Sequence, residues 1–210
     1  MTDTHRNLLS LYGSALLNGV YCLFLAVMAI YHRTFWYGSF SFYYLCLCLI
    51  LVFLVCRTDS FTTGTRLHRE WIRYLICSII LLIMNLALAI IVFFMVYWGR
   101  TFYHHQITTI TMAVFTFAAL SLAITRLTHL RKTKSPVRQA TILIRLVSGC
   151  VSLLTLESTM LTTFQQESSN PLTAKLLLSI SGGVICLGSI LLSIGMICHG
   201  LKELKHEKEI

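Results

Sequence analysis

One carboxylate lies deep inside a long apolar stretch of this sequence, where a charge is expensive to bury. Glu157 occurs within "SLLTLESTML", in a helix that we expect over 139–164, and roughly 10 Å from its outer end at about 1.5 Å per residue. An ionised carboxylate at that depth needs a partner, or it takes up a proton. Its position therefore marks a candidate site for a proton or a cation.

Polar residues on two neighbouring helices lie at a comparable depth. They are Tyr43, Tyr44, Thr108 and Thr111, and with Glu157 they form a predicted polar cluster in the outer half of the protein. This cluster indicates a path for a proton, a cation or a small solute. A second interpretation stays open, in which a neutral Glu157 is hydrogen-bonded to a tyrosine or threonine and holds helices together. The change Glu157→Gln separates the two, since only the transport path needs an ionisable group.

Arg145 lies in the same predicted helix, about two turns from its inner end, where a long side chain can reach the surface. Hydroxyl side chains then recur at spacings of three and four residues, which places them on one face. They are Ser148, Ser152, Thr155, Thr159 and Thr163. At about 100° per residue, Glu157 falls on roughly the opposite face. This stripe is interpreted either as the lining of an aqueous path or as a surface that packs against another helix.

Amide and small residues in other helices predict close helix packing. The candidate packing residues are Asn18, Asn85, Ser179, Gly183, Ser189 and Ser193. The two amides fall near mid-membrane, where each is expected to hydrogen-bond to another helix. The four small residues form two pairs, each spaced four apart, in the last apolar segment. That segment is expected to pack against the hydroxyl stripe or against its own copy in a homodimer.

Residue patterns for catalysis and metal binding are missing from the sequence. It contains no H-E-x-x-H, no G-x-S-x-G and no Gly-rich phosphate loop. His104 and His105 are adjacent, so they diverge by about 100° on a helix, and no carboxylate follows them nearby. The eight cysteines form no C-x-x-C pair. We therefore predict no enzyme activity, no cofactor and no metal site.

The composition is that of an integral membrane protein. Hydrophobic residues make up 56% and charged residues 12% of the 210 residues, and the mean hydropathy is +0.76. A soluble domain carries about twice that share of charged residues. Six apolar segments are near or above the ~20 residues that cross a bilayer. They run over about 8–31, 37–56, 72–98, 106–125, 139–164 and 172–199. We predict an all-α, single transmembrane domain over 1–210 with no soluble domain.

Basic residues gather on one side of the predicted helices. That side carries Arg6, Arg57, Arg66, Arg69, Arg73, Arg126, Arg131, Lys132, Lys134, Arg138, Lys202, Lys205 and Lys208. The opposite side carries Arg33, Arg100 and Lys175. By the positive-inside rule both termini are cytoplasmic, so the helices form three outward-pointing hairpins in the cell membrane. The inner basic loops are expected to meet anionic lipid headgroups, and the net charge of +9 therefore indicates no nucleic-acid partner.

Two predicted outer turns share nearly the same letters, "RTFWY" at 33–37 and "RTFYH" at 100–104. The third outer turn begins with the related "TTFQQ" at 162–166. An interfacial belt of aromatic residues, with an Arg for lipid headgroups, explains the match. Three duplicated hairpins are the alternative explanation. Both interpretations give the same architecture.

Two further stretches carry a family resemblance. "RKTKSPVRQA" precedes the fifth predicted helix, and "LLNGVYCLFLAVMAIYHRTFWYGS" covers the first helix and its turn. Both resemble the corresponding parts of the membrane domain of cation diffusion facilitators, which implies six helices with inner termini. That family's paired His or Asp metal ligands correspond here to Phe40 with Tyr43 or Tyr44, and to Ile144 with Ser148. The resemblance therefore implies the fold without the metal ligands. The chain also resembles compact six-helix membrane proteins of Gram-positive bacteria that lack an assigned role.

Two functions are consistent with these observations. The first is a small transporter or pore, monomeric or dimeric, that moves a proton, a cation or a small solute near Glu157. The alternative is a non-transporting membrane subunit or scaffold that binds a partner membrane protein or anionic lipid. A six-helix bundle favours the first only by analogy of fold.

Overall fold

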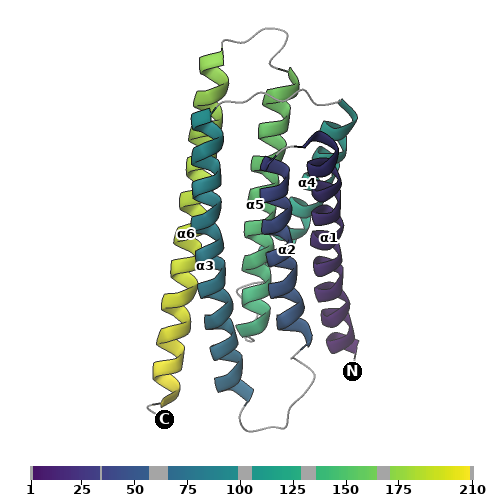
Figure 1. Cartoon of the computed structure of the whole chain (residues 1–210). Coiled ribbons are helices and arrows are strands. Elements are labelled where there is room, and N and C mark those ends of the chain that lie inside the picture. Colours follow the sequence, from purple (N-terminus) through teal and green to yellow (C-terminus); the bar gives the residue numbers. More distant parts are fainter. Residues whose placement is uncertain are drawn as a thin grey trace.

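The computed structural model describes residues 2–33, 35–56, 66–98, 106–128, 136–164 and 171–208. Within these residues the regular structure is entirely α-helical (Figure 1). The helices are α1 (Thr2–His32), α2 (Phe35–Cys56), α3 (Arg66–Trp98), α4 (Gln106–Leu127), α5 (Pro136–Phe164) and α6 (Pro171–Lys208). The prediction of an all-α protein with six helices is therefore confirmed.

Five of these helices contain stretches that are long and apolar enough to cross a membrane. The stretches are Phe35–Leu54, Glu70–Tyr97, Thr109–Leu127, Pro136–Leu161 and Leu176–Lys205. In α1 the apolar stretch within the described side chains is shorter and covers Ala15–Tyr31. Such lengths are compatible with a multi-pass membrane protein.

The exposed surface of the bundle is apolar, whereas its interior holds hydroxyl and amide groups. Phe93 of α3, Val114 of α4 and Leu187 of α6 are 64–66% exposed. Asn85 of α3 and Ser193 of α6, by contrast, are fully buried. An apolar exterior around hydrogen-bonded polar groups is the arrangement that a hydrocarbon solvent favours.

The helix ends follow local sequence signals. Proline is the first residue of both α5 and α6, a position where its missing N–H costs no hydrogen bond. The α6 helix runs on to Lys208 because "LKELKHEK" is rich in strong helix formers. Arg33 follows α1 with a φ of 49°, a left-handed conformation that reverses the chain into α2.

The six helices pack as three close pairs, two of them between consecutive helices and one between helices far apart in the chain. Helix α1 packs along α2, α3 along α6, and α4 along α5. Helices α3 and α4, which are consecutive, are not a closely packed pair within the described residues. Helix α5 lies at the centre and also contacts α1, α2, α3 and α6. The predicted outer connections at 99–105 and 165–170 lie outside the described residues.

Helix α1 begins and α6 ends at the same end of the bundle (Figure 1). This end is called the terminal end below. The last turn of α4 and the first turn of α5 lie at the terminal end as well, because each helix runs in the opposite direction to the one before it.

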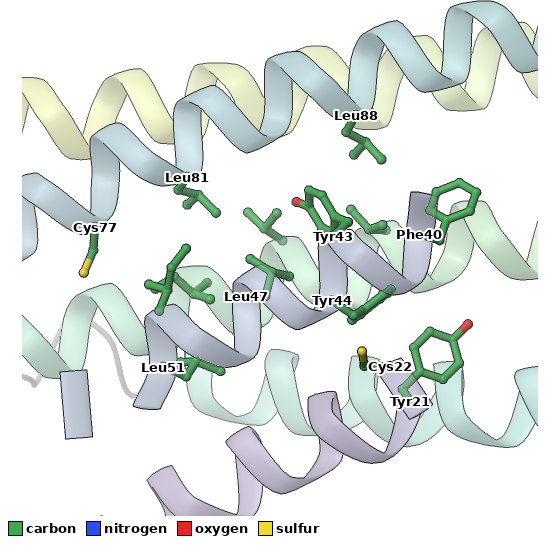
Figure 2. Close-up of a cluster of buried hydrophobic side chains, with 14 of the residues drawn as sticks. Tyr21, Cys22, Phe40, Tyr43, Tyr44, Leu47, Leu51, Cys77, Leu81 and Leu88 are labelled. Carbon is green, nitrogen blue, oxygen red and sulfur yellow. The ribbon is translucent and has the colours of Figure 1, made fainter. Parts of the chain in front are cut away.

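One hydrogen-bond network joins α2, α3 and α6 through Asn85. The Tyr43 hydroxyl donates to Asn85 Oδ1 at 2.9 Å. Asn85 Nδ2 donates to Ser193 Oγ at 2.9 Å and to the Ser189 carbonyl oxygen at 3.1 Å. Figure 2 shows Tyr43 on the side of α2 that faces Leu88 of α3. The amide of Asn85 therefore has both its oxygen and its nitrogen engaged inside the core.

A second network joins α1, α2 and α5 through Ser148. Its hydroxyl donates to Asn18 Oδ1 at 2.8 Å, and its carbonyl oxygen accepts a 3.0 Å bond from the Tyr44 hydroxyl. Tyr44 lies on the side of α2 near Tyr21 and Cys22 (Figure 2). Two buried networks thus connect α2 to opposite sides of the bundle.

Candidate functional site

The structure places Glu157 on the side of α5 that faces away from α1 and α2. Ser148, which contacts both of those helices, is nine residues earlier on α5. Nine residues correspond to about 13 Å along a helix and to half a turn around it. Glu157 is half-buried, and among the described residues no hydrogen bond joins it to Tyr43 or Tyr44.

Two other members of the predicted polar cluster have their hydrogen-bond partners elsewhere. Tyr43 is bonded to Asn85, and Tyr44 is bonded to the Ser148 carbonyl. Thr111 is exposed, and the side chain of Thr108 lies outside the described part of the chain. The structure therefore does not bring the predicted cluster together around Glu157.

The hydroxyl stripe of α5 is a packing surface. Ser148, Ser152, Thr155 and Thr159 are all buried. The Ser152 carbonyl accepts a hydrogen bond from Thr116 of α4, and the Thr159 hydroxyl lies 3.2 Å from the sulfur of Met112, also on α4. These contacts favour the packing interpretation of the stripe over an aqueous path.

The small residues of α6 divide between two faces. Ser189 and Ser193 are buried against α3, whereas Ser179 is exposed and no atom lies within 4 Å of a Cβ added at Gly183. The close approach occurs one residue earlier, at Gly182. A Cβ there would lie 2.8 Å from Cγ1 of Val92 and 3.3 Å from Cδ1 of Leu154. The spacing of small residues in the sequence pointed to Gly183, because spacing alone does not show which of two neighbouring glycines is in contact with another helix.

A pocket of about 200 Å³ lies between α1, α4 and α5 near the terminal end of the bundle. It is lined by Gly13, Leu17, Asn18, Phe115, Ala119, Leu122, Ala123, Arg126, Arg145 and Ser148. Three helices contribute to the lining, and α5 forms the side toward the bundle centre. This pocket is the candidate functional site.

Two arginines from different helices line this pocket. Arg126 belongs to the last turn of α4, and Arg145 lies nine residues, or about 14 Å, after the start of α5. Both side chains are half-buried, and their charges are near enough to repel each other. No carboxylate belongs to the described lining. Two basic side chains and no acidic one thus belong to the described lining.

Asn18 of α1 adds a third hydrogen-bond donor. Its side chain is buried and lines the pocket, and its oxygen accepts the Ser148 hydroxyl. Within the described residues no hydrogen bond engages the Asn18 side-chain nitrogen, so this NH₂ group is available to a ligand. The side-chain oxygen of Asn18 and the backbone carbonyl oxygen of Ser148 thus already accept hydrogen bonds, and the group that Asn18 offers to a ligand is a donor.

A pair of stacked rings lies next to the pocket, and one of them, Phe115, belongs to its lining. Tyr21 of α1 and Phe115 of α4 stack with ring centroids 3.8 Å apart and planes at 1°. Tyr21 also meets Tyr44 edge-on at 4.7 Å. These rings join α1 to α4 next to the pocket, while α1 and α4 are not a closely packed pair along the rest of their described length.

The sequence contains part of the signal for this site. Arg145 stands out in the sequence because it lies deep within a predicted helix. Arg126 was counted only among the basic residues that predict the orientation of the helices in the membrane. Their meeting with Asn18 depends on contacts across 108 and 127 residues of chain, which no local spacing reveals.

No known protein family matches the chain, and no curated protein matches it either. Four of the positions at which the resemblance to cation diffusion facilitators would place metal ligands are core residues here. Phe40, Tyr43, Tyr44 and Ile144 are at most 1% exposed. No group of three or more His, Cys, Asp or Glu side chains that could hold a metal ion occurs among the described residues.

Proposed function

We propose that this protein is a multi-pass protein of the cell membrane, with both termini cytoplasmic, that binds an anion in the pocket between α1, α4 and α5. The observation that carries the proposal is that Arg126 and Arg145 line one small pocket whose described lining includes no carboxylate. Guanidinium groups donate paired hydrogen bonds to phosphate and carboxylate oxygens. The Asn18 NH₂ group supplies a third donor from the opposite wall.

Burial of Arg145 supports the same conclusion on energetic grounds. An arginine at the centre of a membrane helix costs about 2.5–3.5 kcal/mol on insertion scales, and this figure is an upper bound for Arg145, which lies nine residues after the start of α5. A second positive charge beside it adds repulsion. A bound anion would offset the repulsion between the two guanidinium groups.

The pocket favours anion binding over the cation path that was predicted near Glu157. Two guanidinium groups repel a cation, and Tyr43 and Tyr44, which were expected to accompany Glu157, are engaged elsewhere in the core. An anion site of this kind is compatible with a transporter-like protein and with a lipid-binding subunit. We assign no reaction to the pocket.

Anion-dependent thermal unfolding tests this function. The protein in phosphatidylcholine nanodiscs is melted with no added anion, with inorganic phosphate and with phosphatidic acid in the bilayer. We expect at least one of the two anions to raise the unfolding temperature, because a ligand that binds only the folded state stabilises it. The rise should disappear in Arg126→Gln and Arg145→Gln.

The matched control is Lys202→Gln, which removes one exposed positive charge on α6 at the terminal end of the bundle, away from the pocket lining. It should keep the full anion-dependent rise. A rise that Lys202→Gln reduces as much as the two arginine changes do would mean that the anion acts only through the general charge of the protein. The absence of any rise with either anion would also overturn the proposal.

A further inference from the structure

The hydroxyl group of Tyr21 on α1 is buried and has no hydrogen-bond partner within the described residues. The whole side chain is only 1% exposed. We infer that this hydroxyl belongs to a binding site for a single water molecule, which bridges Tyr21 of α1, Tyr37 of α2 and Thr155 of α5. These three residues are called the three-hydroxyl site below. None of them belongs to the described lining of the anion pocket, so the inference does not rest on the proposed function.

The ring of Tyr21 is held in place by two other rings. It stacks on Phe115 of α4 with centroids 3.8 Å apart and planes at 1°, and it meets Tyr44 of α2 edge-on at 4.7 Å. Figure 2 shows the ring beside Tyr44, with its hydroxyl pointing away from Cys22. The hydroxyl lies on the axis of a rigid ring, so it moves only if the ring moves. It therefore cannot reach a distant partner without breaking both ring contacts.

Two hydroxyl groups from other helices lie near that of Tyr21. Thr155 and Tyr37 both act on it electrostatically, but within the described residues neither forms a hydrogen bond with it. Both side chains are buried. The Thr155 hydroxyl donates its only hydrogen to the Val151 carbonyl oxygen at 2.7 Å, so its oxygen can accept a further bond but cannot donate one. The site thus combines a donor that lacks an acceptor with an acceptor that has capacity left.

One water molecule has the hydrogen-bonding groups that this site requires. Its oxygen accepts the hydrogen of the Tyr21 hydroxyl, and its two hydrogens are directed to the oxygens of Thr155 and Tyr37, each of which has two lone pairs. Buried waters in proteins typically make about three such bonds. A buried hydroxyl without a partner is costly, and the hydrocarbon around a membrane-spanning bundle offers it none. A bridging water removes this cost and leaves the ring contacts of Tyr21 intact.

The chemistry of the three-hydroxyl site selects a small neutral ligand. Tyrosine and threonine hydroxyls are uncharged at neutral pH, so they do not compensate the charge of an ion inside a membrane. Water presents an acceptor and two donors on one atom, which matches the donor of Tyr21 and the acceptor of Thr155. It also requires little room, about the volume of one water-sized sphere, or roughly 10–15 Å³. We therefore assign water to the site and not an ion.

The bridging water gives the central helix a second polar link to both α1 and α2. The first link is made at Ser148, which bonds to Asn18 of α1 and to Tyr44 of α2. Thr155 lies seven residues, or about 10 Å, further along α5 and farther from the terminal end. The water therefore fixes the α1–α2 pair against α5 at a second level of the bundle.

Water-edited solid-state NMR of the full chain in phosphatidylcholine bilayers tests the inference. Tyrosine is labelled with ¹³C at the ring Cζ, and Tyr21→Phe identifies the signal of Tyr21. We expect magnetisation from water to reach Tyr21 several-fold faster than it reaches Tyr43. Tyr43 is the matched control, because it is equally buried and its hydroxyl already donates to Asn85 Oδ1 at 2.9 Å. Transfer to Tyr21 that is no faster than transfer to Tyr43 would overturn the inference.

The sign of a stability change gives an independent test. Tyr21→Phe should lower the folding equilibrium constant about twofold to tenfold, because it removes a hydrogen bond to the water. If the hydroxyl were instead buried without any partner, the same change would remove an unpaired polar group and stabilise the protein. Equilibrium unfolding of the two proteins measures the sign, and a rise in stability would overturn the inference.

The acceptor of the site is tested by Thr155→Val, which keeps the shape of the side chain and removes its oxygen. It should reduce the transfer of magnetisation from water to Tyr21 several-fold. Thr141→Val is the matched control, since Thr141 lies on the same helix, is equally buried and likewise donates to the carbonyl oxygen four residues earlier, that of Val137, at 2.9 Å. Equal transfer to Tyr21 in the two variants would show that Thr155 does not hold the water and would overturn the inference.

Discussion

The Ser148 hydroxyl of α5 donates a 2.8 Å hydrogen bond to Asn18 Oδ1 of α1, and this bond determines which atom of Asn18 faces the pocket as a free group. With the oxygen engaged, the NH₂ group remains beside Arg126 and Arg145. A bond that looks purely structural thus also sets the chemistry of the pocket. The same polar residue holds two helices together and presents a donor to a ligand.

Replacing the side-chain amide of Asn18 by a carboxylate should convert the anion site into an internal ion pair with the two arginines. In Asn18→Asp the carboxylate can still accept the Ser148 hydroxyl, and its second oxygen faces the two arginines. We expect a higher unfolding temperature without added anion and the loss of the anion-dependent rise. Thermal unfolding with and without phosphatidic acid measures both effects.

Asn85→Asp is the matched control for that change. Asn85 Nδ2 donates to Ser193 and to the Ser189 carbonyl, so a carboxylate there would face two oxygens in a buried site. The control should lower the unfolding temperature, because a buried group loses its partners. If Asn18→Asp destabilises the protein to the same extent, the positive character assigned to the pocket is wrong.

The bond between Tyr43 and Asn85 is expected to stabilise the contact of α2 with α3 by a modest amount. Interhelical hydrogen bonds of this kind average about 0.6 kcal/mol and reach about 1.7 kcal/mol in membrane proteins. Tyr43→Phe removes only the hydroxyl that donates to Asn85 Oδ1 at 2.9 Å. A double-mutant cycle with Asn85→Leu, measured by equilibrium unfolding, should give a coupling free energy in this range. Strictly additive effects would show that the bond contributes nothing.

The neighbouring glycines of α6 give a paired packing test. Gly182→Ala places a methyl group 2.8 Å from Cγ1 of Val92, so a shift of α3 or α5 is needed, at about 1–3 kcal/mol. Gly183→Ala meets no atom within 4 Å and should stabilise the helix by up to about 1 kcal/mol through propensity alone. Chemical unfolding of the two variants measures the difference. Equal effects would mean that α3 does not approach α6 at Gly182.

Glu157→Gln tests the path predicted from the sequence. Because Glu157 lies on the opposite side of α5 from Ser148, outside the pocket, we expect unchanged anion binding and unchanged stability to within about 0.5 kcal/mol. Proton and cation flux in proteoliposomes should be the same for both proteins. Flux that is present in the wild type and lost with the carboxylate would restore Glu157 as a transport site.

Local chemistry was enough to predict the helices of this protein. Each apolar run is long enough to satisfy its own backbone hydrogen bonds, so helix formation needs no knowledge of the partner. Proline at the start of α5 and α6 marks two of the boundaries directly. The periodicity of α5 places Glu157 on the face opposite Ser148, because nine residues make two and a half turns.

Only the tertiary structure decided which helices meet. Spacing shows which residues share a face, but it does not choose between α3 with α4 and α3 with α6, and the close packing is with α6. The same limit separated Gly182 from Gly183, because contact depends on where Val92 arrives from another helix. It also hid the pocket, since Asn18, Arg126 and Arg145 converge only when α1, α4 and α5 pack. Side-chain period is a local property, whereas the partner of each face is selected by the packing of the whole bundle.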